Sequence, residues 1–196
     1  MSPPLLNLAA FLKDTRMAGP GMRDALWVQG CSIRCPGCAN QAYFEHAPRR
    51  LVSVERLLRH FASRREMIDG LSLLGGEPTE QPEAVAALLA GVQALGLSTV
   101  LFSGRTLESL QEDRACAAIL AHTDLLIDGP FVLAEQDLTL AWRGSRNQRM
   151  VRLTDRFDLQ ALNPPRANGE IVVNSRGALL HGIGTRALAR NKRTGH

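Results

Sequence analysis

The stretch Leu71-Ser72-Leu73-Leu74-Gly75-Gly76 is the clearest structural signal in this sequence of 196 residues. A short apolar run that ends in a pair of glycines is typical of a strand buried inside a sheet. Three further short apolar runs, each with a single glycine two residues after its end, predict strands at Ala25–Val28, Ser98–Phe102 and Leu125–Ile127.

Helical patterns separate these strands. Apolar residues recur at intervals of three and four, which places them on one face of a helix. Ser53 and Thr106 stand where a helix begins and can cap its first turn, whereas Gly96 stands where one ends. The expected helices cover residues 54–61, 85–95 and 106–120.

Strands that alternate with helices imply parallel βαβ units with right-handed crossovers. There are too few units for a closed eight-fold barrel, so we expect an α/β fold that forms an open, partial parallel β/α barrel. The length favours a single domain over residues 1–196. Near the end, Asn174-Ser175-Arg176-Gly177 predicts a hairpin at about 170–181, followed by a flexible basic tail at 185–196.

Short turns that contain glycine follow three of the expected strands. Gly75-Gly76, Ser103-Gly104 and Asp128-Gly129 would all lie at the carboxyl edge of the sheet, where parallel α/β folds bind their ligands. Glycine at such turns allows the main chain to approach a ligand closely. Ordinary tight turns remain the alternative for any one of them.

The composition excludes several classes of protein. The net charge of +4 is spread along the chain and aromatic residues make up 5%, which argues against nucleic-acid binding. No apolar run approaches the roughly 20 residues that span a membrane, and residues 1–11 make a poor signal peptide. Three of the four cysteines fall within eight residues. That clustering favours a metal site in a reducing cytoplasm over a disulfide framework.

The clustered cysteines read Cys31-Ser32-Ile33-Arg34-Cys35-Pro36-Gly37-Cys38, a C-x3-C-x2-C pattern. Three thiolates on one short loop can bind three irons of a 4Fe–4S cluster and leave the fourth iron free to chelate a substrate. The alternative is a structural zinc site, for which His46 would be the fourth ligand. Cys116 belongs to a helical pattern and is interpreted as a core residue.

These motifs, in this order, resemble the radical S-adenosylmethionine superfamily, and within it the small enzymes that activate glycyl radical proteins. The sequence departs from the family at Ala18, where many relatives have Asp or Asn, and at Ser103-Gly104-Arg105, where they often have Thr-Gly-Tyr. The segments that carry the resemblance are Gly19-Pro20-Gly21-Met22-Arg23, Val28-Gln29-Gly30-Cys31, Cys35-Pro36-Gly37-Cys38-Ala39-Asn40, Leu73-Leu74-Gly75-Gly76-Glu77-Pro78, Ile127-Asp128-Gly129-Pro130-Phe131 and Trp142-Arg143-Gly144-Ser145-Arg146-Asn147-Gln148.

The resemblance implies a role for each motif. The three clustered cysteines would ligate the 4Fe–4S cluster, and the main chain of Gly37, Cys38 and Ala39 would lie against the adenine of S-adenosylmethionine. Gly75, Gly76 and Glu77 would receive the methionyl ammonium, so a β-carbon at Gly76 is expected to point into the methionyl group. The remaining assignments are Ser103 for ribose or carboxylate, Asp128 for ribose or for capping a turn, and Arg143, Arg146, Asn147 and Gln148 for binding the partner, locking the rim or forming a solvated loop.

The implied activity is reductive cleavage of S-adenosylmethionine to a 5′-deoxyadenosyl radical, which would activate a large glycyl radical enzyme such as anaerobic ribonucleotide reductase. Flavodoxin or ferredoxin would supply the electron. No general base is needed, so no catalytic residue is assigned beyond the cluster and cofactor. Two alternatives stay open: a radical enzyme that modifies another protein, peptide or small molecule, and a binding module that carries zinc or a cluster without being an enzyme.

Overall fold

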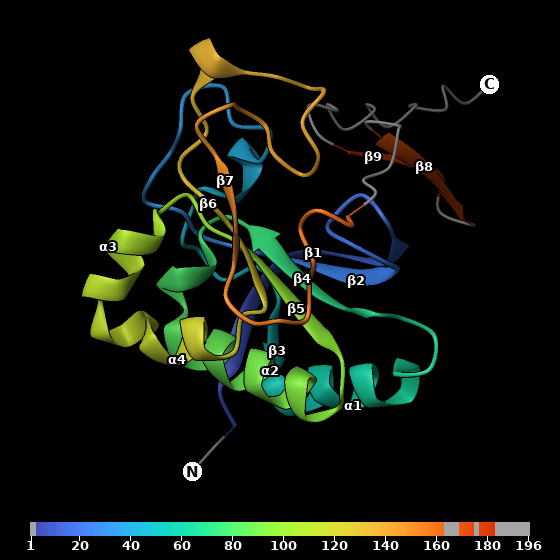
Figure 1. Cartoon of the computed structure of the whole chain (residues 1–196). Coiled ribbons are helices and arrows are strands. Elements are labelled where there is room, and N and C mark those ends of the chain that lie inside the picture. Colours follow the sequence, from blue (N-terminus) through green and yellow to red (C-terminus); the bar gives the residue numbers. More distant parts are fainter. Residues whose placement is uncertain (1–2, 163–168, 175–176, 183–196) are drawn as a thin grey trace, which may run out of the picture.

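The computed structural model describes residues 3–162, 169–174 and 177–182. Its main feature is a sheet of seven strands in the order β3-β1-β2-β4-β5-β6-β7, with helices packed on it (Figure 1). The strands are β1 (Leu5–Thr15), β2 (Arg23–Val28), β3 (Leu51–Ser53), β4 (Gly70–Gly75), β5 (Ser98–Phe102), β6 (Leu125–Asp128) and β7 (Arg149–Arg152). The helices are α1 (Val54–Arg64), α2 (Pro82–Ala94), α3 (Leu107–Glu112) and α4 (Ala117–Ala121).

The centre of the sheet is parallel, as predicted. β2, β4, β5 and β6 are parallel neighbours, and helices connect them in sequence. The sheet is open, because its order begins at β3 and ends at β7 without closing into a ring. The register pairs Val28 with Gly75 and Phe102 with Ile127, so the carboxyl ends of the parallel strands lie at one edge. The prediction of an open parallel α/β fold is therefore confirmed.

Antiparallel strands extend both sides of this centre. β1 pairs with β2 and with β3, and β7 pairs with β6. The sequence is compatible with either a strand or a helix at residues 1–11, and it gives no indication of β3 or β7. These three strands widen the sheet on either side of the parallel strands that position the glycine turns.

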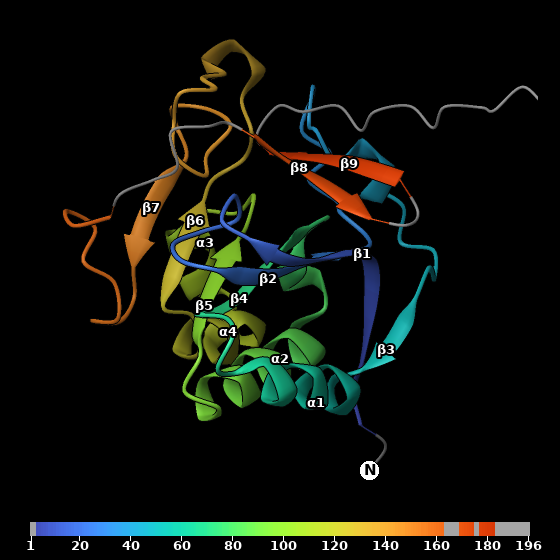
Figure 2. The same cartoon turned by 90° about the vertical axis from the view of Figure 1, so that its right-hand side faces the viewer.

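The two faces of the sheet are buried differently. Leu26 and Val28 of β2 belong to the large core with α1 and α2, whereas Ala25 and Trp27 belong to a smaller cluster on the other face. Figure 2 shows α1 and α2 lying together on one side of the strands. Because side chains alternate along a strand, the apolar runs of the parallel strands supply both clusters.

Capping side chains begin two of the helices as expected. Ser53 accepts a hydrogen bond from the Arg56 main-chain N–H at 3.3 Å, and Thr106 accepts one from Ser109 at 3.3 Å. The third expected helix is not continuous, however. Asp113 adopts an extended conformation and accepts from the Ala115 N–H at 3.0 Å. This local bond starts a new turn, so the stretch divides into α3, a 3-10 turn and α4.

The end of the chain contributes a second, separate sheet. β8 (Gly169–Asn174) and β9 (Gly177–Gly182) pair antiparallel, with Glu170 opposite His181. The basic tail expected at 185–196 lies outside the described residues, and the single-domain organisation stays a prediction. Within the described ranges, none of the helices has the length and apolar character that crossing a membrane requires.

Candidate functional site

The three glycine turns meet at one cavity of about 160 Å³. It lies at the carboxyl edge of the sheet, where β4, β5 and β6 end. The cysteine loop that follows β2 and several aromatic side chains also line this cavity. Its lining includes Cys31, Cys35, Cys38 and Asn40 from the cysteine loop, Gly75, Gly76 and Glu77 after β4, Ser103 and Gly104 after β5, and Gly129, Phe131 and Gln148 near the rim.

The cysteine loop is closed at its base by main-chain hydrogen bonds. The Gly30 N–H donates to the Tyr43 carbonyl at 2.8 Å, and the Cys31 N–H donates to the Phe44 carbonyl at 3.0 Å. Within the loop, the Cys38 N–H donates to the Cys35 carbonyl at 3.2 Å. These bonds fold the loop back on itself, and as a result all three clustered cysteines line the cavity.

The protonation of two of these thiols depends on what they bind. Burial raises the pKa of Cys31 and of Cys38 above the ordinary value of 9.0. Both groups are therefore thiols at neutral pH unless a metal takes the place of the proton. Their ionisation would thus be coupled to loading of the site.

The donor set of three thiolates on one loop fits a 4Fe–4S cluster. In the part of the chain that the structure describes, no three His, Cys, Asp or Glu side chains converge tightly enough to bind a single metal ion. A 4Fe–4S cluster makes a different demand, because each cysteine binds a different iron and the sulfur atoms stand apart. His46 was the possible fourth zinc ligand, but its Nε2 lies 2.6 Å from Glu80 Oε2.

The Gly-Gly turn packs directly on the cysteine loop. The Gly76 N–H donates to the Val28 carbonyl at 2.8 Å, and the Glu77 N–H donates to the Gly30 carbonyl at 2.7 Å. A β-carbon added at Gly76 would lie 2.0 Å from the Gly30 oxygen. The expectation that it would point into the methionyl group is therefore wrong. The glycine is required because the cysteine loop crosses the turn at that point.

Glu77 is buried, with 1% of its surface exposed, so it is not a surface carboxylate. Oε1 accepts from the Thr79 hydroxyl at 2.8 Å, from the Thr79 N–H at 3.1 Å and from the Ser103 hydroxyl at 2.9 Å. Oε2 accepts from the Gly104 N–H at 2.8 Å. Burial raises the pKa of Glu77, while these hydrogen bonds oppose the rise. The carboxyl group joins the β4 turn to the β5 turn at the cavity wall.

Ser103 and Asp128 differ in their relation to the cavity. Ser103 lines it, but its hydroxyl donates to Glu77 and accepts from the Arg105 N–H at 3.0 Å. Asp128 is fully buried and is not part of the lining. It accepts from the Leu107 N–H at 2.7 Å and from Arg149 Nε at 3.0 Å. Its side chain thus caps α3 and pairs with β7, and the structure does not bring it to the cavity.

Gly37 and Ala39 are exposed and do not line the cavity, although Cys38 between them does. Their proposed contact with adenine stays a prediction. The side chain of Arg105 bonds to residues in α3 and directly after it. Its Nη1 lies 2.8 Å from Asp113 Oδ2, and its Nη2 donates to the Ser109 carbonyl at 2.9 Å.

The segment from Trp142 to Gln148 is tied to the turn after β6. Asn147 Nδ2 donates to the Pro130 carbonyl at 2.7 Å, and Gln148 Nε2 donates to the Gly129 carbonyl at 3.0 Å. Gln148 Oε1 also accepts from the Gly144 N–H at 2.7 Å. These bonds hold Asn147 and Gln148 against the turn after β6. The two arginines of this segment behave differently: Arg143 Nη1 reaches the Gln148 carbonyl at 3.4 Å, whereas Arg146 is exposed.

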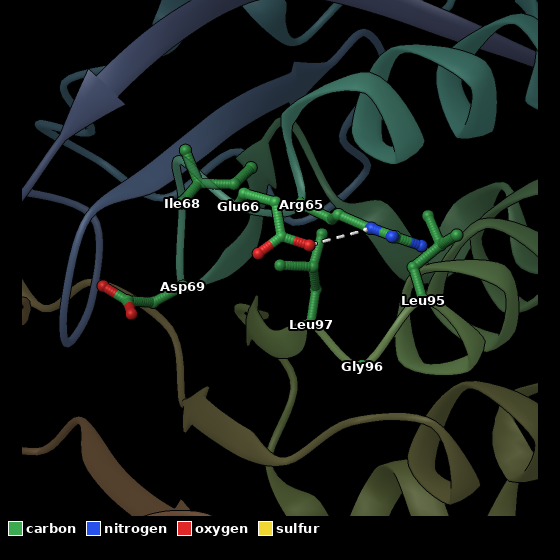
Figure 3. Close-up of a pocket in the computed structure, with 7 residues that line it drawn as sticks. All are labelled: Arg65, Glu66, Ile68, Asp69, Leu95, Gly96 and Leu97. Carbon is green, nitrogen blue, oxygen red and sulfur yellow. Dashed lines mark hydrogen bonds and ion pairs between the residues drawn. The ribbon is translucent and has the colours of Figure 1, made fainter.

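A second pocket, of about 360 Å³, lies at the opposite end of the parallel strands (Figure 3). It is formed where the chain enters β4 and β5, and Ile68, Asp69 and Leu97 line it. Arg65 and Glu66, which pair at 3.1 Å, form part of its wall. It contains none of the motif residues that the sequence singled out around the cysteines.

Asn40 is one of the cavity residues to which the sequence assigns no role. It was visible only as the residue that ends the motif Cys35-Pro36-Gly37-Cys38-Ala39-Asn40. Phe44 lines the cavity without belonging to any of the quoted motifs. Both residues lie after Cys38, where the chain folds back toward Gly30 and Cys31. The spacing of the cysteines alone does not determine the path of this segment.

Comparison with known proteins agrees with this site. The model of the 4Fe–4S single cluster domain family matches residues 17–151. An anaerobic ribonucleoside-triphosphate reductase-activating protein from Vibrio cholerae is 34% identical over 144 residues, which cover 69% of this chain and 91% of that protein. The protein of the same name from Pasteurella multocida is 31% identical and is covered to 99% of its length, with 76% of this chain aligned.

Among solved structures, QueE from Escherichia coli matches with a TM-score of 0.42 and 17% identity over 53% of each chain. The matches along the sequence are much more extensive. This chain belongs to the family of anaerobic ribonucleoside-triphosphate reductase-activating proteins and carries a 4Fe–4S single cluster domain.

Proposed function

We propose that this protein binds a 4Fe–4S cluster through Cys31, Cys35 and Cys38 and uses it to cleave S-adenosylmethionine. The observation that carries the proposal is that these cysteines and the three glycine turns line the same cavity. A protein that merely carried a cluster would need the cysteines alone. The glycine turns add main-chain groups to the wall of the same cavity, where a substrate bound to the cluster could be received.

A reduced cluster bound by these cysteines would supply one electron to the sulfonium of S-adenosylmethionine, with methionine and a 5′-deoxyadenosyl radical as the products. The protein supplies binding and geometry. The carbonyl groups of Gly75 and Gly76 would accept hydrogen bonds from the methionyl ammonium. Glu77, which also lines the cavity, would place a carboxyl group near that ammonium.

The radical would take a hydrogen atom from the α-carbon of a glycine in a large partner enzyme, giving 5′-deoxyadenosine and a glycyl radical. The names of the relatives support anaerobic ribonucleoside-triphosphate reductase as that partner. A flavodoxin or ferredoxin in the cytoplasm would return the electron to the cluster. The net charge of +4 is compatible with docking to an acidic donor.

The test is an anaerobic incubation of the reconstituted protein with dithionite and S-adenosylmethionine. Methionine and 5′-deoxyadenosine should form in equal amounts, and Cys35→Ala should form neither. If the loaded protein leaves S-adenosylmethionine intact, the cluster serves a binding module and the proposal fails. If 5′-deoxyadenosine forms but no reductase gains a radical, the substrate is another protein, a peptide or a small molecule.

A further inference from the structure

Asn40 links the cysteine loop to the Gly-Gly turn. Its main-chain N–H donates to Cys38 Sγ at 3.4 Å, and its side-chain Nδ2 donates to the Gly75 carbonyl at 3.3 Å. The second bond joins residues 35 positions apart in the sequence. Asn40 also lines the cavity, together with both of the groups that it contacts.

The side chain of Asn40 is not engaged in the local role that asparagine commonly plays. Asn40 precedes a short 3-10 turn, Gln41–Tyr43, but makes no side-chain cap to it. Asparagine at such a position usually accepts from the N–H groups of the turn that follows. Here the amide reaches across to the end of β4 instead. Its contact with Gly75 is therefore a tertiary feature of the site.

The peptide between Gly75 and Gly76 is fastened at both of its polar groups. Its N–H belongs to Gly76 and donates to the Val28 carbonyl at 2.8 Å. Its carbonyl belongs to Gly75 and accepts from Asn40. A peptide flanked by two glycines lacks the steric barriers that β-carbons impose, so its orientation depends on these two hydrogen bonds. The Asn40 amide holds the peptide from the side of the carbonyl.

A carbonyl oxygen has two lone pairs, so one hydrogen bond from Asn40 leaves a second position for another donor. Gly75 lies on the cavity wall, where the methionyl ammonium is proposed to bind. We propose that Asn40 is a positioning residue for S-adenosylmethionine: it orients the Gly75 carbonyl toward the ammonium and fixes that carbonyl relative to the Cys38 sulfur. This inference rests on the proposed function.

The test compares Asn40→Ala and Asn40→Leu with the wild-type protein, each reconstituted with iron and sulfide without oxygen. Leucine has the same branching and the same number of side-chain heavy atoms as asparagine but no donor, which separates the hydrogen bond from the space that alanine leaves. Gln41→Ala is the matched control, because Gln41 is the next residue and its side chain is exposed. Iron content, the dissociation constant of S-adenosylmethionine by calorimetry, and the effect of S-adenosylmethionine on the electron paramagnetic resonance signal of the reduced cluster are measured.

We expect iron content at the wild-type level in all variants. Both Asn40 variants should bind S-adenosylmethionine about tenfold more weakly, the effect of losing one hydrogen bond, and should need correspondingly more of it to change the cluster signal. Affinities within twofold of wild type would overturn the inference. Loss of the cluster in both variants would also overturn it, because Asn40 would then only stabilise the loop. A wild-type protein that does not bind S-adenosylmethionine would instead show that the proposed function is wrong.

Discussion

The carboxylate of Glu77 accepts a 2.8 Å hydrogen bond from the main-chain N–H of Gly104, which joins the turn after β4 to the turn after β5. The Ser103 hydroxyl adds a second link between the same two turns at 2.9 Å. Two of the three glycine turns at the cavity are thus fixed relative to each other by one side chain. Glu77, which the sequence suggests for ligand binding, therefore also holds together two of the turns that form the cavity wall.

Glu77→Ala should therefore destabilise the fold. It leaves the Gly104 N–H and the hydroxyl groups of Ser103 and Thr79 without their acceptor in a buried position. A loss of about 2–3 kcal/mol in the free energy of unfolding is expected, measured by anaerobic urea denaturation of the reconstituted protein. The control is Glu80→Ala. Glu80 accepts a hydrogen bond from the Ser32 N–H of the cysteine loop. Its side chain is 24% exposed, so water can replace the lost carboxylate. Equal losses in the two variants would contradict this account of Glu77.

The four cysteines should differ in whether the cluster depends on them. Alanine at Cys31, Cys35 or Cys38 should abolish the cluster, whereas Cys116→Ala should retain about four iron and four sulfide per chain. Cys116 is fully buried in the core beside Arg105, so its replacement should cost only about 1 kcal/mol of stability. Metal analysis and visible absorption of reconstituted protein measure the outcome. Stoichiometric zinc without broad visible absorption would favour the structural zinc site instead.

Gly76 and Gly104 should respond differently to alanine, although both line the cavity. At Gly76 the new β-carbon would meet the main-chain oxygen of Gly30 at 2.0 Å, so the cysteine loop must move. At Gly104 it would meet the end of the Ile33 side chain at 2.6 Å, which can rotate away. We expect Gly76→Ala to lose most of its iron and Gly104→Ala to retain it. Full iron loading of Gly76→Ala would contradict the expected clash between the new β-carbon and the Gly30 oxygen.

Arg149 should control the ionisation of Glu108. The two guanidinium Nη atoms lie 3.0 and 2.8 Å from the carboxylate oxygens of Glu108 and lower its pKa from 4.5 to about 2. Because the pKa is lower in the folded state, the stabilisation is present above pH 4.5 and is lost as the pH falls toward 2. In Arg149→Met the pKa should return toward 4.5, as followed by carboxyl carbon resonances during an acid titration. Arg105→Met is the control and should leave it unchanged.

The sequence predicts the parallel centre of the fold well, because strands buried on both faces appear as short apolar runs between helical patterns. It predicts the flanking strands poorly. β1 carries Asn7, Lys13 and Asp14 among its apolar residues, and β3 has only three residues, so neither shows a clear period. The interruption of the third helix at Asp113 depends on one local hydrogen bond that competes with the helical pattern.

For the site, the sequence identifies the motifs but not how they contact one another. The spacing of the cysteines and the position of each glycine after a strand can be read locally. The burial of Glu77 depends on donors from the next strand end, and the contact of Asn40 with Gly75 depends on the return of the cysteine loop. Such contacts join segments distant in sequence, so periodicity and spacing carry no information about them.

The measurement that tests the central claim most directly is electron paramagnetic resonance of a mixture prepared without oxygen. It contains the reduced, reconstituted protein, S-adenosylmethionine and the anaerobic ribonucleoside-triphosphate reductase of the same organism. The account predicts the doublet of a glycyl radical on the reductase, together with 5′-deoxyadenosine, and neither product when Cys35→Ala replaces the wild-type protein. A mixture in which the wild-type protein carries its cluster, but neither 5′-deoxyadenosine nor the radical appears, would contradict it.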